Sequence, residues 1–400
     1  MRAAMHQIAK ALGGGRSLLA VVAKRGGLVM LDQAVVSGTS FLTAVIIARA
    51  CGTDGFGVFS LALSAVFLVA GVQASLITTP YTVYCHRYSE QRPRNYSGNA
   101  LWQFVGLGSI VALLLVTTGV LLQFAPARAF VAPLLLALSA ALPALLLREF
   151  VRRFAMTHFR LTTLLPMDIG IAAVQLGGLF CLAKYNLLTP AVAYLAIALS
   201  CFLAGLPALL SLKNQFKLTP LRSAHDLRRN WSFGRWLLGG QVTFLLTAYS
   251  IPWLLAAMCG TADTGLYGAC MSVIMLTSPL VQGVCSYLVP QPSESFATGG
   301  VPALRQITRF AGGLLGLEFV LFTAVMLFAG EEIAVFVYGD AFIDSGLLIG
   351  ILALAMTIYA LGMVADIGVW AMRHPQLNFA ANAAGMMVTV TLATFLIWNI

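Results

Sequence analysis

Long apolar segments follow one another along almost the whole chain, and each is long enough to cross a lipid bilayer as a helix. A membrane-spanning helix needs about 20 apolar residues. We predict eleven such helices, at residues 26–50, 56–84, 98–123, 129–150, 162–184, 188–212, 234–258, 263–289, 307–329, 345–371 and 377–400. With 60% hydrophobic and only 10% charged residues, the chain has too few charges to cover a soluble surface. The sequence therefore predicts an all-α polytopic membrane protein, because helices satisfy their own backbone hydrogen bonds in lipid.

The basic residues are distributed by side of this predicted bundle. All but three of the 24 Lys and Arg lie in the N-terminal segment or in even-numbered connections, and the exceptions are Arg49, Arg128 and Lys184. Cytoplasmic loops of membrane proteins carry the excess of Lys and Arg, so we expect a cytoplasmic N-terminus. This asymmetry also accounts for the net charge of +10, so nucleic acid is not needed as a partner to explain the basic residues. The lipid bilayer is the expected partner instead.

A sequence repeat divides the predicted bundle into two halves. The tripeptide Cys-Gly-Thr occurs at residues 51–53 and 259–261, and a Gly, an apolar and an aromatic residue follow each copy after a gap of three. The same offset pairs Gln33 with Gln241. Each copy lies between two apolar segments, so a helix–turn–helix unit is duplicated at half-chain spacing. This predicts two pseudo-symmetric six-helix lobes, and two halves around a cleft are a common transporter plan.

The repeat and the charges predict four parts of the chain. These are a basic cytoplasmic segment (1–25), an N-lobe with helices 1–6 (26–212), a cytoplasmic linker (213–233) and a C-lobe with helices 7–11 (234–400). The repeat partner of the sixth helix would extend past Ile400, the last residue of the sequence. We therefore expect a twelfth helix to be missing from the second lobe, and the alternative is a protein of eleven helices. The seven cysteines form no Cys-x-x-Cys pair, so no metal site is predicted.

The first predicted hairpin resembles a known family. Residues 32–43, Asp-Gln-Ala-Val-Val-Ser-Gly-Thr-Ser-Phe-Leu-Thr, lead to the Cys-Gly-Thr turn, and Gly-Phe-Gly-Val-Phe-Ser-Leu-Ala follows at 55–62. Together with Thr-Thr-Pro-Tyr-Thr-Val-Tyr at 78–84, this resembles the start of bacterial polysaccharide flippases. They belong to the multidrug/oligosaccharidyl-lipid/polysaccharide exporter (MOP) superfamily, which also holds the multidrug and toxic compound extruders (MATE). The close resemblance covers about residues 26–95 and includes no catalytic residues.

The resemblance implies two six-helix lobes around a central cleft that opens alternately to each side of the membrane. It implies that a polyprenyl diphosphate-linked oligosaccharide is flipped from the inner to the outer leaflet of the bacterial inner (plasma) membrane for surface polysaccharide biosynthesis. A polysaccharide polymerase and glycosyltransferases are the expected protein partners. A MATE-type, ion-coupled exporter of small molecules is the alternative. A membrane enzyme is disfavoured, because the outer connections are short and contain no His.

Acidic residues inside predicted helices are candidates for ion coupling, because a charge in the bilayer costs several kcal/mol unless it faces protein or water. Four acids lie there, namely Asp32, Asp168, Glu318 and Asp366. Asp32 begins the family-like segment and Glu318 lies nearest the midplane, so both are candidates for binding a proton or sodium ion. No other cofactor is expected. The alternatives are structural: Asp32 paired with Lys24 or Arg25, and Glu318 as a neutral hydrogen-bonded carboxyl.

Cationic and polar side chains are candidates for contacts with such a substrate. Arg148 and Arg152 are four residues apart, so they share a helix face, and guanidinium groups bind phosphate in a forked geometry. Arg49, at the outer end of the first helix, would receive the headgroup after flipping. The neutral candidates for sugar contacts are Gln33, Gln241 and Tyr81. Positive-inside flanking explains Arg148 and Arg152 equally simply, and helix–helix hydrogen bonding explains the polar residues.

Overall fold

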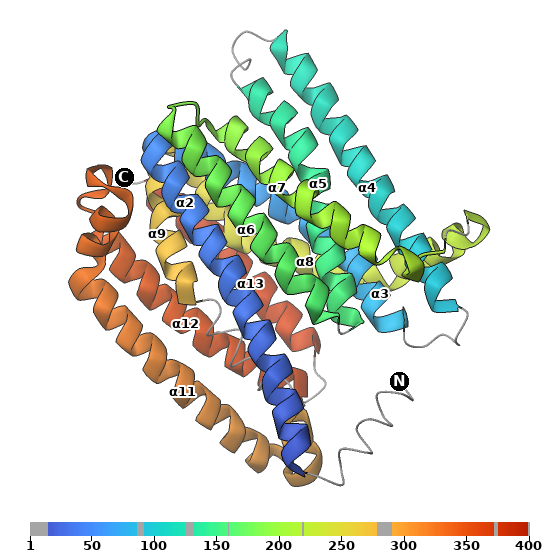
Figure 1. Ribbon diagram of the computed structural model, residues 1–400. Helices are drawn as coiled ribbons and strands as arrows, with labels where there is room; N and C mark the ends of the chain where they lie inside the picture. The colour runs from blue at the N-terminus through green and yellow to red at the C-terminus, as the bar shows by residue number, and fades with distance from the viewer. Residues whose placement is uncertain are drawn as a thin grey trace. The chain divides into compact units, whose positions relative to one another are not determined.

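The computed structural model is built from α-helices (Figure 1). It describes residues 15–85, 92–124, 131–158, 160–217, 220–277, 290–371 and 375–398. Within these residues there is no strand, so the all-α prediction is confirmed. The side chain of Asp366 and the first 14 residues lie outside the described part.

The helices follow the predicted apolar segments, except that α9 ends at Ile274 and residues 278–289 of the predicted eighth helix lie outside the described part. They are α2 (Gly15–Gln73), α3 (Thr79–Tyr84), α4 (Arg92–Gln123), α5 (Ala132–Thr157), α6 (Leu161–Lys184), α7 (Pro190–Ser211), α8 (Pro220–Met258), α9 (Thr261–Ile274), α11 (Pro290–Tyr338), α12 (Gly346–Ala371) and α13 (Pro375–Trp398). In the described part, nine helical stretches are long and apolar enough to cross a membrane. The first of them, Met30–Tyr84, contains two predicted crossings. These lengths make the chain a multi-pass membrane protein.

Both copies of the Cys-Gly-Thr repeat turn the chain at their glycine. Gly52, inside α2, has φ 68° and ψ −175°, which interrupts the helix between the first two predicted crossings. Gly260, its repeat partner, has φ 108° and ψ −177° and immediately precedes α9. Residues with a side chain rarely adopt these angles, whereas glycine does so without a steric penalty. The helix–turn–helix predicted for each repeat is therefore present.

Two helices extend beyond the segments predicted from hydropathy. α8 begins at Pro220, within the predicted linker, and continues to Met258. Proline is well suited to the first turn of a helix, where its missing N–H would have had no partner. α11 reaches from Pro290 to Tyr338 with an interruption at Gly300, whereas the apolar segment covered only 307–329. Charged residues at the ends of a helix remain helical, so an apolar window underestimates its length.

The chain forms two compact units that each combine distant segments. Unit 1 comprises Met1–Thr39, Val66–Cys181 and Ala191–Gln241, and unit 2 comprises Ser40–Ala65, Leu182–Pro190 and Val242–Ile400. Both α2 and α8 therefore pass from one unit into the other. The N-lobe and C-lobe boundaries remain predictions, since they were drawn from the repeat rather than from compactness.

Each unit has a core of closely packed helices. In unit 1, α4 and α5 lie side by side (Figure 1), and Phe104 stacks on Phe150 with ring centres 5.2 Å apart. In unit 2, α11 packs along α12 through a cluster that includes the fully buried Leu315 and Phe319. Truncating one buried aromatic side chain to Ala costs about 3–5 kcal/mol. These helix pairs therefore give the site residues a rigid support.

Candidate functional site

Two arginines and two aspartates form a buried cluster in unit 1, which we call the charge cluster (Asp32, Arg148, Arg152 and Asp168). Arg148 donates from Nε and Nη2 to Asp168 Oδ1, at 3.2 and 3.1 Å. Arg152 donates from Nη2 to Asp32 Oδ2 at 3.0 Å, and from Nη1 to Asp168 Oδ2. The Asp168 side chain is 0% exposed and that of Asp32 is 2% exposed. The four charges thus neutralise one another away from solvent.

Three helices bring these side chains together. Arg148 and Arg152 stand one turn apart on α5, so both reach the same neighbours. Asp168 comes from α6 and Asp32 from α2. The α5 residues buried beside them are apolar and include Leu147 and Val151. A charge there is tolerated only when it is paired and hydrogen-bonded, which explains why two cations meet two anions.

One oxygen of the charge cluster has no hydrogen-bond partner among the residues that the structure describes. Asp32 Oδ1 is buried and accepts no hydrogen bond from any residue that the structure describes. The sequence offered Lys24 and Arg25 as partners of Asp32, but their side chains lie outside the described part. The observed partner is Arg152, from a helix distant in sequence. Asp32 therefore combines one satisfied oxygen with one that is open to a proton or a cation.

The sequence identified Asp168 as a buried acid but assigned it no role. In the structure it is the central member of the charge cluster, because it contacts both arginines. The signal that could have found it is charge balance: two arginines on the buried face of a membrane helix need acidic partners on neighbouring helices. Periodicity along α5 and α6 cannot say which acids these are.

Tyr81 and Gln33 also lie in unit 1 and make contacts of their own. The Tyr81 hydroxyl is buried, 2.8 Å from Ser97 Oγ and 2.7 Å from His158 Nε2. Gln33 is half-buried, and its Nε2 lies 3.5 Å from Ser37 Oγ, one turn along α2. Gln241 is half-buried on α8. The structure thus joins none of these three to the charge cluster through a hydrogen bond among the described residues.

A buried polar network, which the sequence did not predict, lies near the start of α8. Asn99 Nδ2 donates to Asp226 Oδ2 at 2.6 Å, and Tyr96 donates its hydroxyl to Asn230 Oδ1 at 2.7 Å. The Arg229 guanidinium lies 4.1 Å from the centre of the Tyr84 ring, within the range of a cation–π interaction. These contacts anchor the polar end of α8 to α3 and α4 within unit 1.

The two other charged candidates belong to unit 2. Arg49 is exposed and donates from Nε to the Val337 carbonyl oxygen at 2.7 Å, and from Nη2 to that of Phe336. Cations near the last carbonyl groups of a helix interact favourably with the helix dipole, so Arg49 caps α11. Glu318 is half-buried on α11, and its buried Oε1 has no hydrogen-bond partner among the described residues.

The two copies of the repeat touch each other in unit 2, at what we call the repeat contact (residues 53–57 and 261–265). A Cβ atom on Gly57 would lie 1.9 Å from the backbone oxygen of Thr261. A Cβ atom on Gly265 would lie 1.9 Å from the backbone oxygen of Thr53. The two glycines are repeat partners, as are the two threonines, so the contact is reciprocal. Only glycine permits such close approach of two backbones.

Side chains hold the same hairpin against the rest of unit 2. Thr261 Oγ1 donates to Asp54 Oδ1 at 2.6 Å, beside the repeat contact. Trp253 Nε1 donates to Ser64 Oγ at 2.8 Å, further along the hairpin. Together with the contact of Arg49 with α11, these hydrogen bonds attach residues 40–65 to later segments of unit 2. The hairpin of the first repeat is therefore docked on elements of the second.

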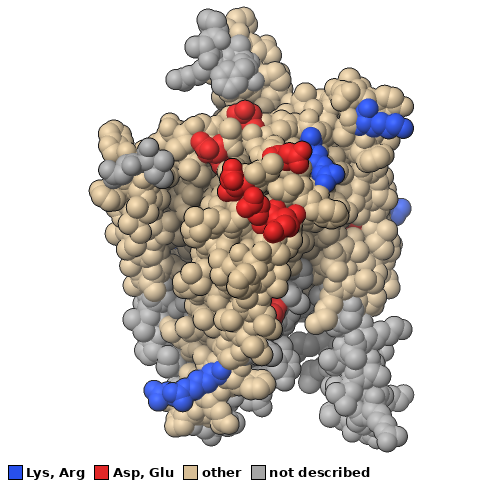
Figure 2. Space-filling model, turned by 90° about the vertical axis from the view of Figure 1, so that its left-hand side faces the viewer, with Lys and Arg blue, Asp and Glu red and all other residues tan. Residues whose placement is uncertain are grey.

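Acidic side chains gather over one part of the face shown in Figure 2. The exposed acids of unit 2 among the described residues are Asp54, Asp263, Glu332, Asp340 and Asp344. All five lie in connections or at a helix end that the charge pattern predicts to be on the outer side. No group of three His, Cys, Asp or Glu in the described part is arranged to hold a metal ion.

Comparison with protein families shows which family the chain belongs to. The sequence model of a family described as "Polysaccharide biosynthesis protein" matches residues 22–296, which is more than half of the chain. The chain belongs to this family. The membership agrees with the resemblance seen in the first hairpin, and its match covers both copies of the repeat. No curated protein sequence matches this polysaccharide biosynthesis protein.

Solved structures of MOP-superfamily transporters share the fold. An inward-facing MATE family transporter has a TM-score of 0.65 at 10% identity, covering 91% of this chain and 84% of its own. A MOP superfamily transporter from Pyrococcus furiosus has a TM-score of 0.58 at 11% identity, covering 94% and 95%. A eukaryotic MATE transporter has a TM-score of 0.57 at 15% identity, covering 93% and 92%. The predicted MATE-like fold is therefore confirmed.

Proposed function

We propose that this protein flips a polyprenyl diphosphate-linked oligosaccharide from the inner to the outer leaflet of a bacterial inner membrane. Membership of the polysaccharide biosynthesis family supports a glycan cargo. The shared fold of the MOP-superfamily transporters supports movement across the membrane rather than catalysis. A polymerase and glycosyltransferases would consume and supply the cargo, and the N-terminus would be cytoplasmic.

The observation that carries the proposal is the pair of guanidinium groups in the charge cluster. Arg148 and Arg152 lie one helical turn apart on α5, about 6 Å along the axis. A diphosphate offers acceptor oxygens on two linked phosphorus atoms, and arginine binds such oxygens in a forked, charge-assisted geometry. A diphosphate would thus bridge the two arginines, with one phosphate at each.

Cargo and carboxylates would compete for the same donors. Asp32 and Asp168 occupy the guanidinium N–H groups that a diphosphate would need. Binding of the cargo would therefore replace carboxylate–arginine bonds with phosphate–arginine bonds and leave two carboxylates to be neutralised. A proton or sodium ion at the unpartnered Oδ1 of Asp32 would neutralise one of them. Glu318, also with an unpartnered buried oxygen in the described part, is the second ion-coupling candidate.

The repeat contact supports transport by alternating access. It joins the ends of the two repeats that the charge pattern predicts to be on the outer side. Release of the cargo outward would separate these ends. A membrane that is negative inside favours outward movement of an anion by about 2.3 kcal/mol per charge per 100 mV. The cargo's own charge would therefore help to drive the step.

Four further side chains remain proposed contacts for the headgroup. Arg49 uses two of its N–H donors to cap α11 and would offer the others to the diphosphate on the outer side. The proposed sugar contacts are Gln33, Gln241 and Tyr81. Because the Tyr81 hydroxyl already has two partners, it would bind sugar only by exchanging one of them.

Deletion of the gene in its own host, followed by lipid extraction, tests the function. We expect lipid-linked oligosaccharide to accumulate on the cytoplasmic side, with loss of a surface polysaccharide. Unchanged lipid intermediates together with greater sensitivity to cationic drugs would contradict the proposal. That outcome would favour a MATE-type small-molecule exporter, the function that the shared fold also allows.

We predict that Arg148→Gln and Arg152→Gln each reduce transport by about tenfold or more, because a hydrogen bond to a charged group contributes about 1.5–3 kcal/mol. The measurement is flipping of the cargo in proteoliposomes at matched protein amounts. Arg153→Gln is the control, since Arg153 is an exposed arginine of the same helix. The variants Arg148→Lys and Arg152→Lys should each retain part of the activity. Unchanged transport in the double Gln variant would reject both arginines as cargo contacts.

We predict that Asp32→Asn abolishes any stimulation of transport by a proton or sodium gradient, because the amide does not take up a proton near neutral pH and has no negative charge to attract a sodium ion. Glu318→Gln tests the second candidate in the same way. The measurement is the initial flipping rate with and without each gradient. Coupling that survives in both variants would contradict both assignments and would place the ion elsewhere.

A further inference from the structure

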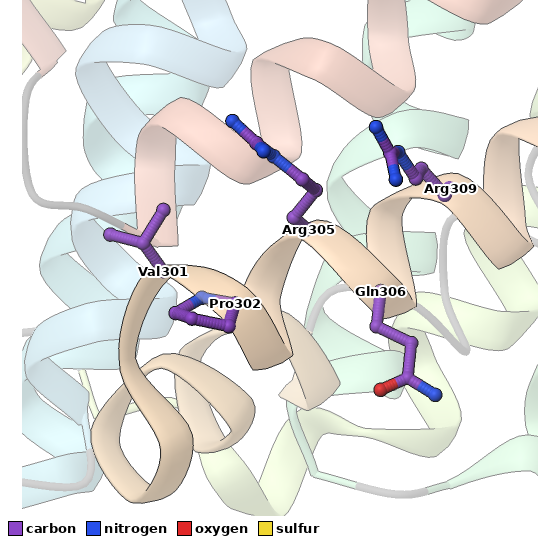
Figure 3. A pocket seen from close by; sticks show the side chains of 5 residues that line it. All are labelled: Val301, Pro302, Arg305, Gln306 and Arg309. Carbon is purple, nitrogen blue, oxygen red and sulfur yellow. The ribbon is translucent and has the colours of Figure 1, made fainter.

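A pocket of about 390 Å³ lies on α11, and all of its described lining residues belong to that helix (Figure 3). Its lining residues are Val301, Pro302, Arg305, Gln306 and Arg309. The guanidinium groups of Arg305 and Arg309 extend from the same side of α11, whereas Gln306 extends from another (Figure 3). The pocket belongs to unit 2, and none of its residues takes part in the charge cluster. The pocket therefore shares no residue with the charge cluster proposed to bind the cargo.

The two arginines of this pocket lack the counter-charges that the charge cluster has. Arg305 and Arg309 are both exposed, and neither forms an ion pair with an acid in the part of the chain that the structure describes. They are four residues apart, so about 6 Å of helix axis separates them. A single phosphate group can accept hydrogen bonds from two guanidinium groups at this spacing. Among the described residues, the pocket thus presents two cations without an acidic partner to one small anion.

Apolar side chains lie beside these cations. Val301 is 53% exposed and Phe310 is 67% exposed, and both are within five residues of Arg305. The helix from Gly300 to Tyr338 is apolar enough to cross the membrane, and the arginines lie at its first turns. This is the level at which a helix leaves the hydrocarbon and meets lipid headgroups. Apolar surface next to paired cations matches a ligand that has acyl chains and a phosphate.

We propose that this pocket binds the phosphate of an anionic phospholipid at the cytoplasmic membrane surface. Basic pockets on that side of membrane proteins bind lipid headgroups. A bilayer phospholipid is favoured over the oligosaccharide cargo, because the pocket is small and Gln306 is its one uncharged polar side chain. The bound lipid would hold the inner end of α11 at the headgroup level. The inference rests on the predicted orientation and does not require the proposed cargo.

Native mass spectrometry of the purified full chain with added phosphatidylglycerol tests this inference. We expect Arg305→Gln with Arg309→Gln to weaken binding about 30-fold, since each cation near the surface contributes ~1 kcal/mol and 1.4 kcal/mol is tenfold in affinity. Phosphatidylcholine binding should not change. The matched control is Arg228→Gln with Arg235→Gln, two exposed arginines of α8, which removes the same charge.

Three results would overturn the inference. One is phosphatidylglycerol affinity that stays the same in the Arg305/Arg309 variant. Another is an equal loss of phosphatidylglycerol affinity in the α8 control variant, which would show that the lipid is attracted by the net charge of the protein rather than by a specific site. The third is inorganic phosphate displacing phosphatidylglycerol at equal concentration, which would assign the pocket to a free anion. If the Gln variant fails to fold, Arg305→Lys with Arg309→Lys keeps the charge and should bind more weakly by losing the forked geometry.

Discussion

At the scale of single residues, the charge cluster shows how a membrane protein keeps four charges away from water. Each carboxylate contacts at least one arginine, and Asp168 contacts both. Removing one member of a buried ion pair is costly because the partner is left with an uncompensated charge. The cluster therefore has a structural role in the resting protein, whether or not cargo binds there.

We predict that Asp168→Ala lowers the free energy of unfolding by about 3–5 kcal/mol, because it leaves two buried arginines with a single carboxylate. Asp32→Ala should cost less, since Asp32 contacts only Arg152 among the described residues. Thermal and denaturant unfolding in detergent measures both. Glu332→Ala, which removes an exposed carboxylate, is the control. Equal stability of Asp168→Ala and the natural sequence would show that the cluster is not formed in solution.

At the scale of elements, the repeat is a pair of turns that fit each other. Gly52 and Gly260 turn the chain through positive φ angles. Gly57 and Gly265 then let the backbones of the two repeats approach closely. The turn glycines could be recognised from the Cys-Gly-Thr pattern, whereas the close approach could not. A glycine needed for contact looks, in sequence, like any glycine in a membrane helix.

We predict that Gly57→Ala shifts the protein toward states in which the repeat contact is separated. The added Cβ would meet a backbone oxygen, which cannot rotate away, and overpacking of this kind costs about 1–3 kcal/mol. Spin labels on Asp54→Cys and Asp263→Cys report the separation. Gly38→Ala is the control on the same helix, because its Cβ would meet nothing within 4 Å. The same distance between the spin labels in Gly57→Ala and in Gly38→Ala would contradict the prediction.

At the scale of the whole molecule, the compact units do not follow the two halves of the sequence. Residues 40–65 from the first repeat are packed with most of the second half of the chain. α2 and α8, the first helices of their repeats, are each shared between the units. The first-repeat side of the repeat contact therefore lies on the part of α2 that continues past Gly52 to residues 66–73 of unit 1.

We predict that a disulfide between Asp54→Cys and Thr261→Cys stops transport and that a reducing agent restores it. The natural side chains already touch, at 2.6 Å, so the two thiols would start close together. Replacement of Cys51 and Cys259 by Ser removes competing thiols, and each single Cys variant serves as a control. Cross-linked protein that transports at the full rate would show that the repeat contact does not open during the cycle.

The sequence by itself determined that this chain is a bundle of membrane helices with a duplicated hairpin. Lipid cannot satisfy backbone hydrogen bonds, so long apolar segments leave little choice but helix. Only the tertiary structure decided which groups meet. Asp32 pairs with Arg152 across 120 residues, Arg49 caps a helix 288 residues away, and Gly57 meets Thr261. No local pattern specifies such partners, because a buried charge or a bare backbone can be satisfied by any neighbour that packing brings near.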